Sequence, residues 1–312
     1  MTRTVLVTGA TGFIGRAVTT DLRRRGWKVR TAANRNAGPG DLRIPLTPGA
    51  DWSSAVAGCD CVVHLAARAH VLRETALDPL AEFIEVNAAA TQTLAKAALA
   101  NGVRRFVFMS SIAVNGPMLG APLTEGDLPK PETDYGHSKL LAEQQLQALL
   151  SASPMELTIL RPPLVFGPGV SARFLQLLNW ANSGLPLPLG GIGNRRSLLS
   201  LDNLTDAIAQ CIANPAAASR TFMVADDAAI STSDLVRVLA RHLRRPARLL
   251  NVPEPLLLLA ASLVGRRGEA EKVTSSLVLD TTLIRQVMDW TPPNTLDAGL
   301  AKVAEWYRDR SR

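Results

Sequence analysis

A tyrosine and a lysine four positions apart are the residues of this sequence best suited to acid–base chemistry. In the run Tyr135-Gly-His-Ser-Lys139 both side chains would share one face of a helix, because residues four apart are neighbours there. A tyrosine has a pKa of about 10 and acts as a base near neutral pH only if a nearby cation lowers that pKa. Ser111 directly follows a predicted strand at 105–110, so its hydroxyl would orient a substrate oxygen. We therefore predict Ser111, Tyr135 and Lys139 as a catalytic centre for hydride transfer at a hydroxyl-bearing carbon.

A glycine-rich loop near the N-terminus predicts the hydride carrier. The loop lies between a predicted strand at 4–8 and a predicted helix at 14–25, the context that a dinucleotide-binding motif requires. Glycines allow the tight turn and let the backbone approach a pyrophosphate, while the helix N-terminus supplies free N–H groups. The predicted cofactor contacts in this loop are Gly9, Thr11, Gly12, Phe13, Ile14 and Gly15.

The end of the next predicted strand, at 29–33, bears on which dinucleotide is bound. A carboxylate there would bond the ribose 2′-hydroxyl, whereas a nearby arginine would receive a 2′-phosphate. The strand ends Ala33-Asn34-Arg35, without a carboxylate. We predict cofactor contacts at Asn34 and Arg35, with NADP(H) favoured over NAD and both left open.

These loops must be positioned by strands that alternate with helices. Further strands are expected at 61–65 and 157–160, and further helices at 78–101 and 135–150. Alternation of this kind predicts an α/β fold with a doubly wound parallel Rossmann sheet. Prolines and glycines crowd 186–193 and less regular helices follow. We expect a dinucleotide-binding domain at 1–165 and a smaller, mostly C-terminal α/β substrate domain at 166–312, with some segments free to return to the sheet.

Composition excludes several other classes of protein. The net charge of +7 comes from dispersed arginines without a nucleic-acid motif, so no nucleic acid partner is expected. Three cysteines suit a reducing compartment, and Cys59-Asp-Cys61 lacks the second pair that a metal site would need. No signal-peptide pattern is present, and the longest apolar run, 256–264, is too short to span a membrane. We expect a cytoplasmic protein with no metal and no membrane partner. In it, 256–264 is expected to form a buried or partly buried helix, in preference to one that lies on a membrane surface.

Together these motifs resemble the extended short-chain dehydrogenase/reductase superfamily, and within it the NAD-dependent epimerase/dehydratase family that includes UDP-glucose 4-epimerase. The resemblance covers nearly the full chain. It implies that Leu65, Ala66 and Ala67 pass under the cofactor, that Asn87 secures it, and that Tyr135, Lys139 and Pro162 also contact it. Ser111 and Tyr135 would bind the substrate, and Arg196 would contact the diphosphate of a sugar nucleotide. His64, between Val63 and Leu65, is expected to be a core residue, and His137 an exposed one.

The resemblance also narrows the reaction. Related 4,6-dehydratases carry an acidic pair directly after the catalytic serine or threonine, where this chain has Ile112 and Ala113, so we predict that it is not a dehydratase. A 4-epimerase acting on a UDP- or dTDP-hexose in surface-polysaccharide synthesis is favoured. The alternative is an NADPH-dependent reductase of a 4-keto-6-deoxy sugar nucleotide. Relatives pair through the helices that match 78–101 and 135–150, which predicts a homodimer.

Overall fold

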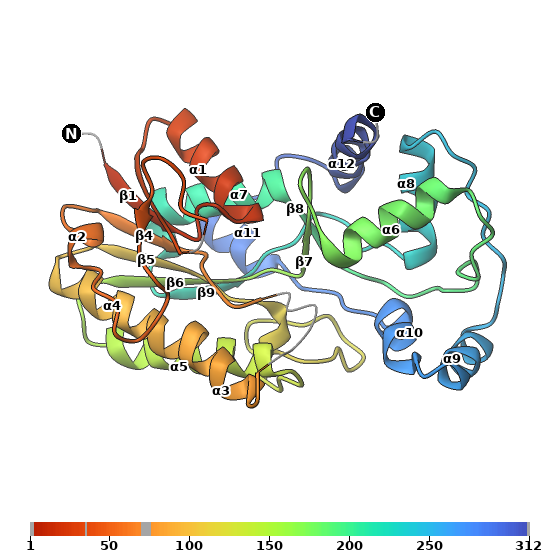
Figure 1. Cartoon of the computed structure of the whole chain (residues 1–312), viewed down its shortest axis with the longest axis horizontal. Coiled ribbons are helices and arrows are strands. Elements are labelled where there is room, and N and C mark those ends of the chain that lie inside the picture. Colours follow the sequence, from red (N-terminus) through yellow and green to blue (C-terminus); the bar gives the residue numbers. More distant parts are fainter. Residues whose placement is uncertain (1–2, 35, 70–75, 311–312) are drawn as a thin grey trace.

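The computed structural model describes residues 3–34, 36–69 and 76–310. Within these residues a parallel sheet of seven strands has the order β3-β2-β1-β4-β5-β6-β9, which confirms the predicted doubly wound fold (Figure 1). In chain order the strands of this sheet are β1 (Thr4–Thr8), β2 (Lys28–Ala33), β3 (Leu42–Arg43), β4 (Cys61–His64), β5 (Arg105–Met109), β6 (Glu156–Arg161) and β9 (Arg220–Met223).

Helices cover both faces of the sheet. Successive side chains of a strand point to opposite faces, so Val5 and Val7 of β1 pack into one core cluster and Leu6 into another. Both faces of the sheet are therefore buried, which explains why the central strands are rich in apolar residues. One face carries α1 (Phe13–Arg24), α7 (Leu201–Ala213) and α11 (Thr282–Met288), and the other carries α2 (Ser53–Val56), α3 (Pro79–Ile84), α4 (Ala90–Ala100) and α5 (Asp134–Leu150) (Figure 1).

The helix predicted at 78–101 is present but changes its winding part-way. Asp78 caps its start by accepting a hydrogen bond from the Ala81 N–H at 3.0 Å. Between α3 and α4 the residues Glu85–Ala89 form a π-helical turn. Such turns are rare and are frequently found at functional sites. This turn carries Asn87, which is fully buried.

A smaller body follows β6. It contains a two-stranded parallel sheet, β7 (Leu164–Phe166) with β8 (Leu198–Ser200), and a core cluster of its own around Phe166, Phe174 and Leu239. Its helices are α6 (Ala172–Ser183), α8 (Thr232–His242), α9 (Glu254–Leu263), α10 (Arg267–Thr274) and α12 (Leu296–Arg310). The chain does not stay in this body, because α7, β9 and α11 return to the large sheet. The assignment of 166–312 mainly to substrate binding stays a prediction.

The apolar run at 256–264 forms most of α9, but its burial is less than expected. No residue of α9, every one of which the structure describes, is buried. Leu257 packs against the small body's core, while Leu256, Leu259 and Leu263 are exposed. In the described part of the chain no helix is both long enough and apolar enough to cross a membrane.

Candidate active site

The three predicted catalytic residues meet where β5 ends. Ser111 follows β5 and caps a short 3-10 helix, Ile112–Val114, by accepting a hydrogen bond from the Ala113 N–H at 3.2 Å. Its side chain also hydrogen-bonds Tyr135, in the first turn of α5. One helical turn further on, the Lys139 ammonium donates to the Met109 carbonyl oxygen at 2.7 Å. The structure therefore brings Ser111, Tyr135 and Lys139 together as the spacing predicted.

Gly136 makes this approach possible. A Cβ atom at this position would lie 2.5 Å from the Ala113 carbonyl oxygen, well inside van der Waals contact. The missing side chain lets the start of α5 rest on the 3-10 helix that follows Ser111. Thr133 fixes the same end of α5 by accepting a hydrogen bond from the Gly136 N–H at 3.1 Å. Gly136 is thus a positioning residue that sequence reasoning did not single out.

The pKa of Tyr135 differs from the sequence-based expectation. Burial raises the pKa of Tyr135 to about 12, and the hydrogen bond with Ser111 offsets only part of this. Burial lowers the pKa of Lys139 to about 7, although the nearby Glu143 carboxylate acts to raise it. The prediction that the ammonium lowers the tyrosine pKa is therefore wrong for the protein alone. Lys139 is directed at the Met109 carbonyl oxygen and lies 4.5 Å from the centre of the Phe108 ring, and desolvation dominates both groups.

A buried ion pair lies behind Lys139. Arg161, at the end of β6, donates to both carboxylate oxygens of Glu143, at 3.0 Å and 2.5 Å. Ser110 also donates to Glu143, and Asn115 accepts from Arg161 at 3.1 Å. Both charged residues are almost fully buried. Because the bidentate pair is held by further hydrogen bonds, it fixes α5 against the ends of β5 and β6, next to the catalytic centre.

The glycine loop has the geometry that a dinucleotide needs. Gly9 has φ +66°, and a Cβ atom there would lie 2.8 Å from the Ala66 nitrogen. The N-cap of α1 is Gly12, which supplies no side-chain hydrogen bond, and the first turn of α1 holds no acidic residue. The first N–H groups of α1 therefore remain for an anion, which is the arrangement that binds a pyrophosphate. Thr11, Phe13 and Ile14 belong to the same turn, and all three are partly exposed.

Gly15 provides a sharp test of this loop. A Cβ atom at Gly15 would lie 2.0 Å from the Gly9 carbonyl oxygen, so Gly15→Ala must push α1 away from the loop. We expect the free energy of unfolding to fall by about 1–3 kcal/mol, with loss of dinucleotide binding. Denaturant titration and cofactor fluorescence would measure the two effects. Gly49→Ala is the matched control, because nothing lies within 4 Å of its added methyl group. Equal behaviour of the two variants would contradict this account.

His64 is a structural residue, as expected. It is fully buried, and its ring nitrogens lie 2.7 Å from the Thr8 hydroxyl and 2.8 Å from the Thr91 hydroxyl. Thr91 donates its own proton to the Asn87 carbonyl oxygen at 2.8 Å, so it accepts from Nε2 of His64 and leaves Nδ1 to accept from Thr8. Burial, assisted by Lys139, lowers the pKa of His64 to about 3. The other predicted histidine, His137, is exposed.

This neutral histidine makes stability depend on pH. The unfolded chain binds a proton at this side chain below pH ~6.5, whereas the folded protein does so only near pH 3. Between those pH values the unfolded state holds more protons than the folded state. The contribution of His64 to the free energy of unfolding therefore falls as pH falls, by at most about 1.4 kcal/mol per pH unit. Denaturant titrations from pH 7 to pH 4 should show a steeper decline for the wild type than for His64→Gln. Parallel curves would exclude this role.

Asn87 holds the segment that follows β4. Its side chain accepts from the Arg68 N–H at 2.7 Å and donates both to the Arg68 carbonyl oxygen and to Ser138, each at 3.0 Å. The predicted cofactor segment Leu65, Ala66 and Ala67 is partly exposed and runs from β4 into this anchor. Asn87 thus couples that segment to α5. The proposed cofactor contact by Asn87 itself stays a prediction.

The remaining predicted contacts lie on other elements. Asn34 is exposed just after β2, and Arg35 lies outside the described residues. Pro162 is buried, and its carbonyl oxygen accepts from the Ile112 N–H at 3.0 Å. Arg196 precedes β8 and donates to the carbonyl oxygens of Lys272 and Ser275, each at 2.9 Å.

A second arginine near Arg196 escaped sequence reasoning. Burial and the charge of Arg173, in the first turn of α6, lower the pKa of Arg196. Among the described residues neither arginine forms an ion pair with a carboxylate. Two neighbouring guanidinium groups without an acidic partner suit a diphosphate. The only sequence signal was an arginine a few positions after the Arg161-Pro-Pro run, which is too common to be informative.

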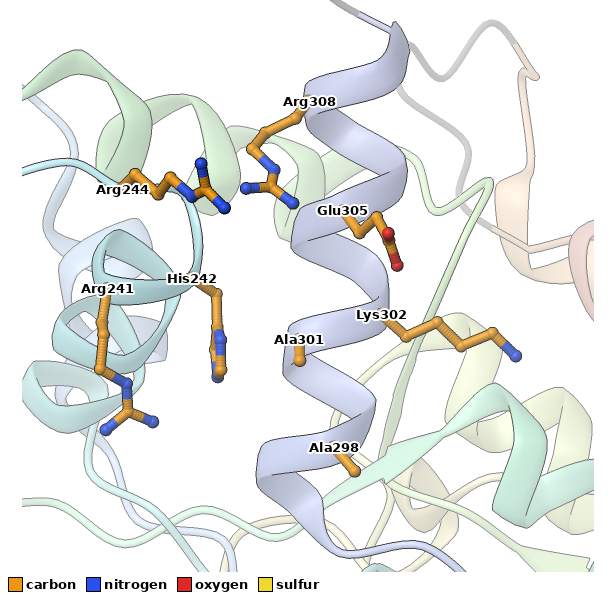
Figure 2. Close-up of a pocket in the computed structure, with 8 residues that line it drawn as sticks. All are labelled: Arg241, His242, Arg244, Ala298, Ala301, Lys302, Glu305 and Arg308. Carbon is orange, nitrogen blue, oxygen red and sulfur yellow. The ribbon is translucent and has the colours of Figure 1, made fainter.

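A separate hollow between α8 and α12 does not belong to this site. Figure 2 shows that its wall is mostly basic, and no predicted catalytic or cofactor residue contributes to it. Arg241 and His242 there share Asp297, at 2.5 Å and 3.1 Å. The lining residues are Arg241, His242, Arg244, Ala298, Ala301, Lys302, Glu305 and Arg308.

The profile of the NAD dependent epimerase/dehydratase family matches residues 5–225. The chain belongs to this family. It is therefore a member of the extended short-chain dehydrogenase/reductase superfamily, as its motifs predicted.

Individual relatives differ in the reactions that their names state. A UDP-glucose 4-epimerase from Vibrio cholerae is 39% identical over 98% of this chain and 96% of its own length. A dTDP-glucose 4,6-dehydratase from Streptomyces griseus is 28% identical over 98% of this chain and 94% of its own length. Among solved structures, MoeE5 in complex with UDP-glucuronic acid and NAD is 28% identical with a TM-score of 0.79, over 99% of both chains. The family member described here is thus similar both to epimerases and to dehydratases.

Proposed function

We propose that this family member is an NAD-dependent 4-epimerase of a UDP-hexose. The observation that carries the proposal is the convergence of Ser111, Tyr135 and Lys139 beside the end of β5, in the same sheet as the glycine loop that follows β1. The 39% identity to a UDP-glucose 4-epimerase over almost the whole chain supports the choice of reaction. Arg196 and Arg173 would receive the diphosphate of the substrate.

Ser111, Tyr135 and Lys139 would each have a separate role in the proposed epimerisation. Ser111 would hold the C4 oxygen of the sugar, and Tyr135 would take the proton of the C4 hydroxyl as the C4 hydrogen leaves. Bound NAD supplies a hydride acceptor that can return the hydride to the opposite face of the sugar. Tyr135 would then give the proton back to the C4 oxygen. Because the pKa of Tyr135 is about 12 in the protein alone, positive charge from Lys139 and the oxidised cofactor would have to stabilise the phenolate.

Dehydration is disfavoured by the residues that follow Ser111. Ile112 is buried and Ala113 is only partly exposed, within the short 3-10 helix. Neither side chain can donate or accept a proton, so water elimination would lack an acid and a base at these positions. We therefore propose epimerisation without net loss of water, even though dehydratases are among the relatives.

One observation favours a second candidate, a 4-keto sugar nucleotide reductase that uses NADPH. Ala33 ends β2 and is buried, so no carboxylate from that position would bond a ribose 2′-hydroxyl. An epimerase regenerates its cofactor in every cycle and can keep NAD bound, whereas a reductase must exchange it.

The deciding experiment measures the cofactor and the reaction together. Purified protein would be denatured and the released dinucleotide identified, and UDP-glucose would be supplied without any added reductant. Release of NAD and formation of UDP-galactose would support the epimerase. Protein free of cofactor, with activity only when NADPH and a keto sugar are added, would overturn it in favour of the reductase.

A homodimer formed through α4 and α5 remains part of the proposal, as does a role in cytoplasmic synthesis of surface-polysaccharide sugars. Leu146 and Leu150 of α5 are buried in the core. Leu140, Leu141 and Leu149 stay partly exposed on α5. Light scattering that detects only monomer would remove the dimer.

A further inference from the structure

Helix α9 presents an apolar face to solvent. Residues three, four and seven positions apart share a helix face, which groups Leu256, Leu259, Ala260 and Leu263. The leucines of this group are 56%, 59% and 82% exposed, and Val264 follows at 69%. The inner face, with Leu257, contacts the small body instead. Most surface helices are polar on the side away from the core. The outer face of α9 is apolar instead, which is unusual for a helix face that contacts only water.

The chain around α9 carries more basic than acidic residues. The segment 245–267, which we call the edge segment, contains four arginines (Arg245, Arg248, Arg266 and Arg267) against one acidic residue, Glu254. All four arginines are exposed. Arg266 and Arg267 also lie near Glu269 and Glu271 of α10, at 3.7 Å and 2.8 Å, but these pairs are open to water. Arg245 and Arg248 have no acidic partner among the described residues.

The edge segment also projects from the molecule. Figure 1 shows α9 at one end of the long axis, beyond α10 and away from the large sheet. The segment approaches it along the margin of the small body, where Leu250 is 54% exposed. Along the sequence, the exposed leucines of α9 therefore lie between Arg245 and Arg248 on one side and Arg266 and Arg267 on the other.

We propose that the edge segment docks this enzyme on an anionic phospholipid bilayer, with the outer leucines of α9 inserted at the level of the headgroups. Exposed apolar side chains of a surface helix can insert at the level of the headgroups, and basic residues nearby add attraction to anionic lipids. The sequence favoured a buried or partly buried helix at 256–264 over a helix that lies on a membrane surface, and the exposure of the outer leucines reverses that preference. Lying on a membrane requires far less length than crossing it.

Charge argues against a second copy of the chain as the occupant. A symmetric dimer would bring the patch against itself, and the arginines without an acidic partner in the described part of the chain, Arg245 and Arg248, would face their own copies and repel them. A helix of ten residues is also only ~15 Å long, which is small for an interface that needs ~800 Å² on each partner. An anionic bilayer matches both the charge and the shape.

Docking would place Arg196, the proposed diphosphate-binding residue, near the membrane. Helix α9 packs against α10, and the C-terminal end of α10 supplies the Lys272 carbonyl oxygen that accepts from Arg196. The proposed diphosphate residue is thus one helix away from the docking face. The inference does not depend on which sugar nucleotide Arg196 receives, and it stands or falls independently of the proposed reaction.

The experiment is flotation of the full chain with vesicles. Wild-type protein should float with vesicles of phosphatidylcholine that contain phosphatidylglycerol, and not with pure phosphatidylcholine. The triple variant Leu256→Ser, Leu259→Ser and Leu263→Ser should lower the vesicle partition coefficient at least ~10-fold. The double variant Arg245→Gln and Arg248→Gln should lower it several-fold and weaken its dependence on salt.

The matched control replaces two exposed leucines elsewhere. Leu119 and Leu128 are 77% and 80% exposed, and their double serine variant should bind vesicles like the wild type. Circular dichroism and turnover of UDP-glucose, measured on every variant, would separate loss of docking from loss of folding or of the proposed function. Failure of the wild type to bind anionic vesicles, or undiminished binding by the triple variant, would overturn the proposal. A triple variant that turns a wild-type dimer into monomer would overturn it too, in favour of a second copy.

Discussion

Replacing Tyr135 with phenylalanine should lower the turnover number for sugar-nucleotide conversion by about 10²–10⁴-fold, while the protein stays folded. The loss corresponds to removing one general acid–base group from the transition state. The phenylalanine ring can keep the edge-to-face contact with Phe83, whose ring centre is 6.3 Å away. Only the hydroxyl that would exchange the proton with the C4 oxygen is lost. Steady-state kinetics with UDP-glucose would measure the effect, and circular dichroism would verify the fold.

The chain offers a matched control for this change. It has only two tyrosines, and the second, Tyr307, donates its hydroxyl to the Asn179 side-chain oxygen at 2.7 Å, on α12 far along the chain from β5. Tyr307→Phe removes the same atom and should leave turnover within about twofold of the wild type. If Tyr135→Phe were as active as Tyr307→Phe, Tyr135 would not be the proton carrier, and every catalytic assignment made for the α5 pair would fail with it.

Local patterns predicted the parts of this site whose residues are close in sequence. Tyr135 and Lys139 lie on one helix, and the glycine loop lies between a strand and the helix that follows it, so spacing alone brings those groups together. The seven-stranded sheet was predictable in outline because five of its strands lie in short strand-like segments that alternate with helical segments. The return of β9 to this sheet was not predictable, because the segment Arg220–Met223 is short and its sequence does not indicate which sheet it joins.

The contacts that were missed are those between distant segments. Arg161 and Glu143 are 18 positions apart on different elements, and nothing in their sequence context shows that they face each other. The pKa of Tyr135 was misjudged for a related reason, because spacing brings the ammonium near but does not reveal burial or the competing Met109 carbonyl oxygen. The exposure of α9 could not be inferred either, since an apolar run looks the same whether its partner is a core or a membrane.

The buried ion pair should dominate the stability of the site. In Glu143→Gln the Arg161 guanidinium keeps its charge in a buried place but loses the carboxylate that faces it. Breaking one side of a buried pair costs about 3–5 kcal/mol, so the free energy of unfolding should fall by that amount. Denaturant titration would measure it. Lys302→Gln is the control, because its pair with Asp202 is largely exposed and should contribute less than ~1 kcal/mol.

Replacing both partners separates the structural effect of the pair from its electrostatic effect. Glu143→Met with Arg161→Met leaves no unpaired charge, so most of the lost stability should return. The pKa of Lys139 should nevertheless differ between the double variant and the wild type. In the wild type the Glu143 charge acts to raise this pKa, which burial lowers to about 7. Without that charge the pKa of Lys139 falls further, and the loss of activity that follows deprotonation of Lys139 should begin at lower pH than in the wild type. A folded double variant with an unchanged pH profile of kcat would show that Glu143 supports the position of α5 alone and has no influence on the charge of Lys139.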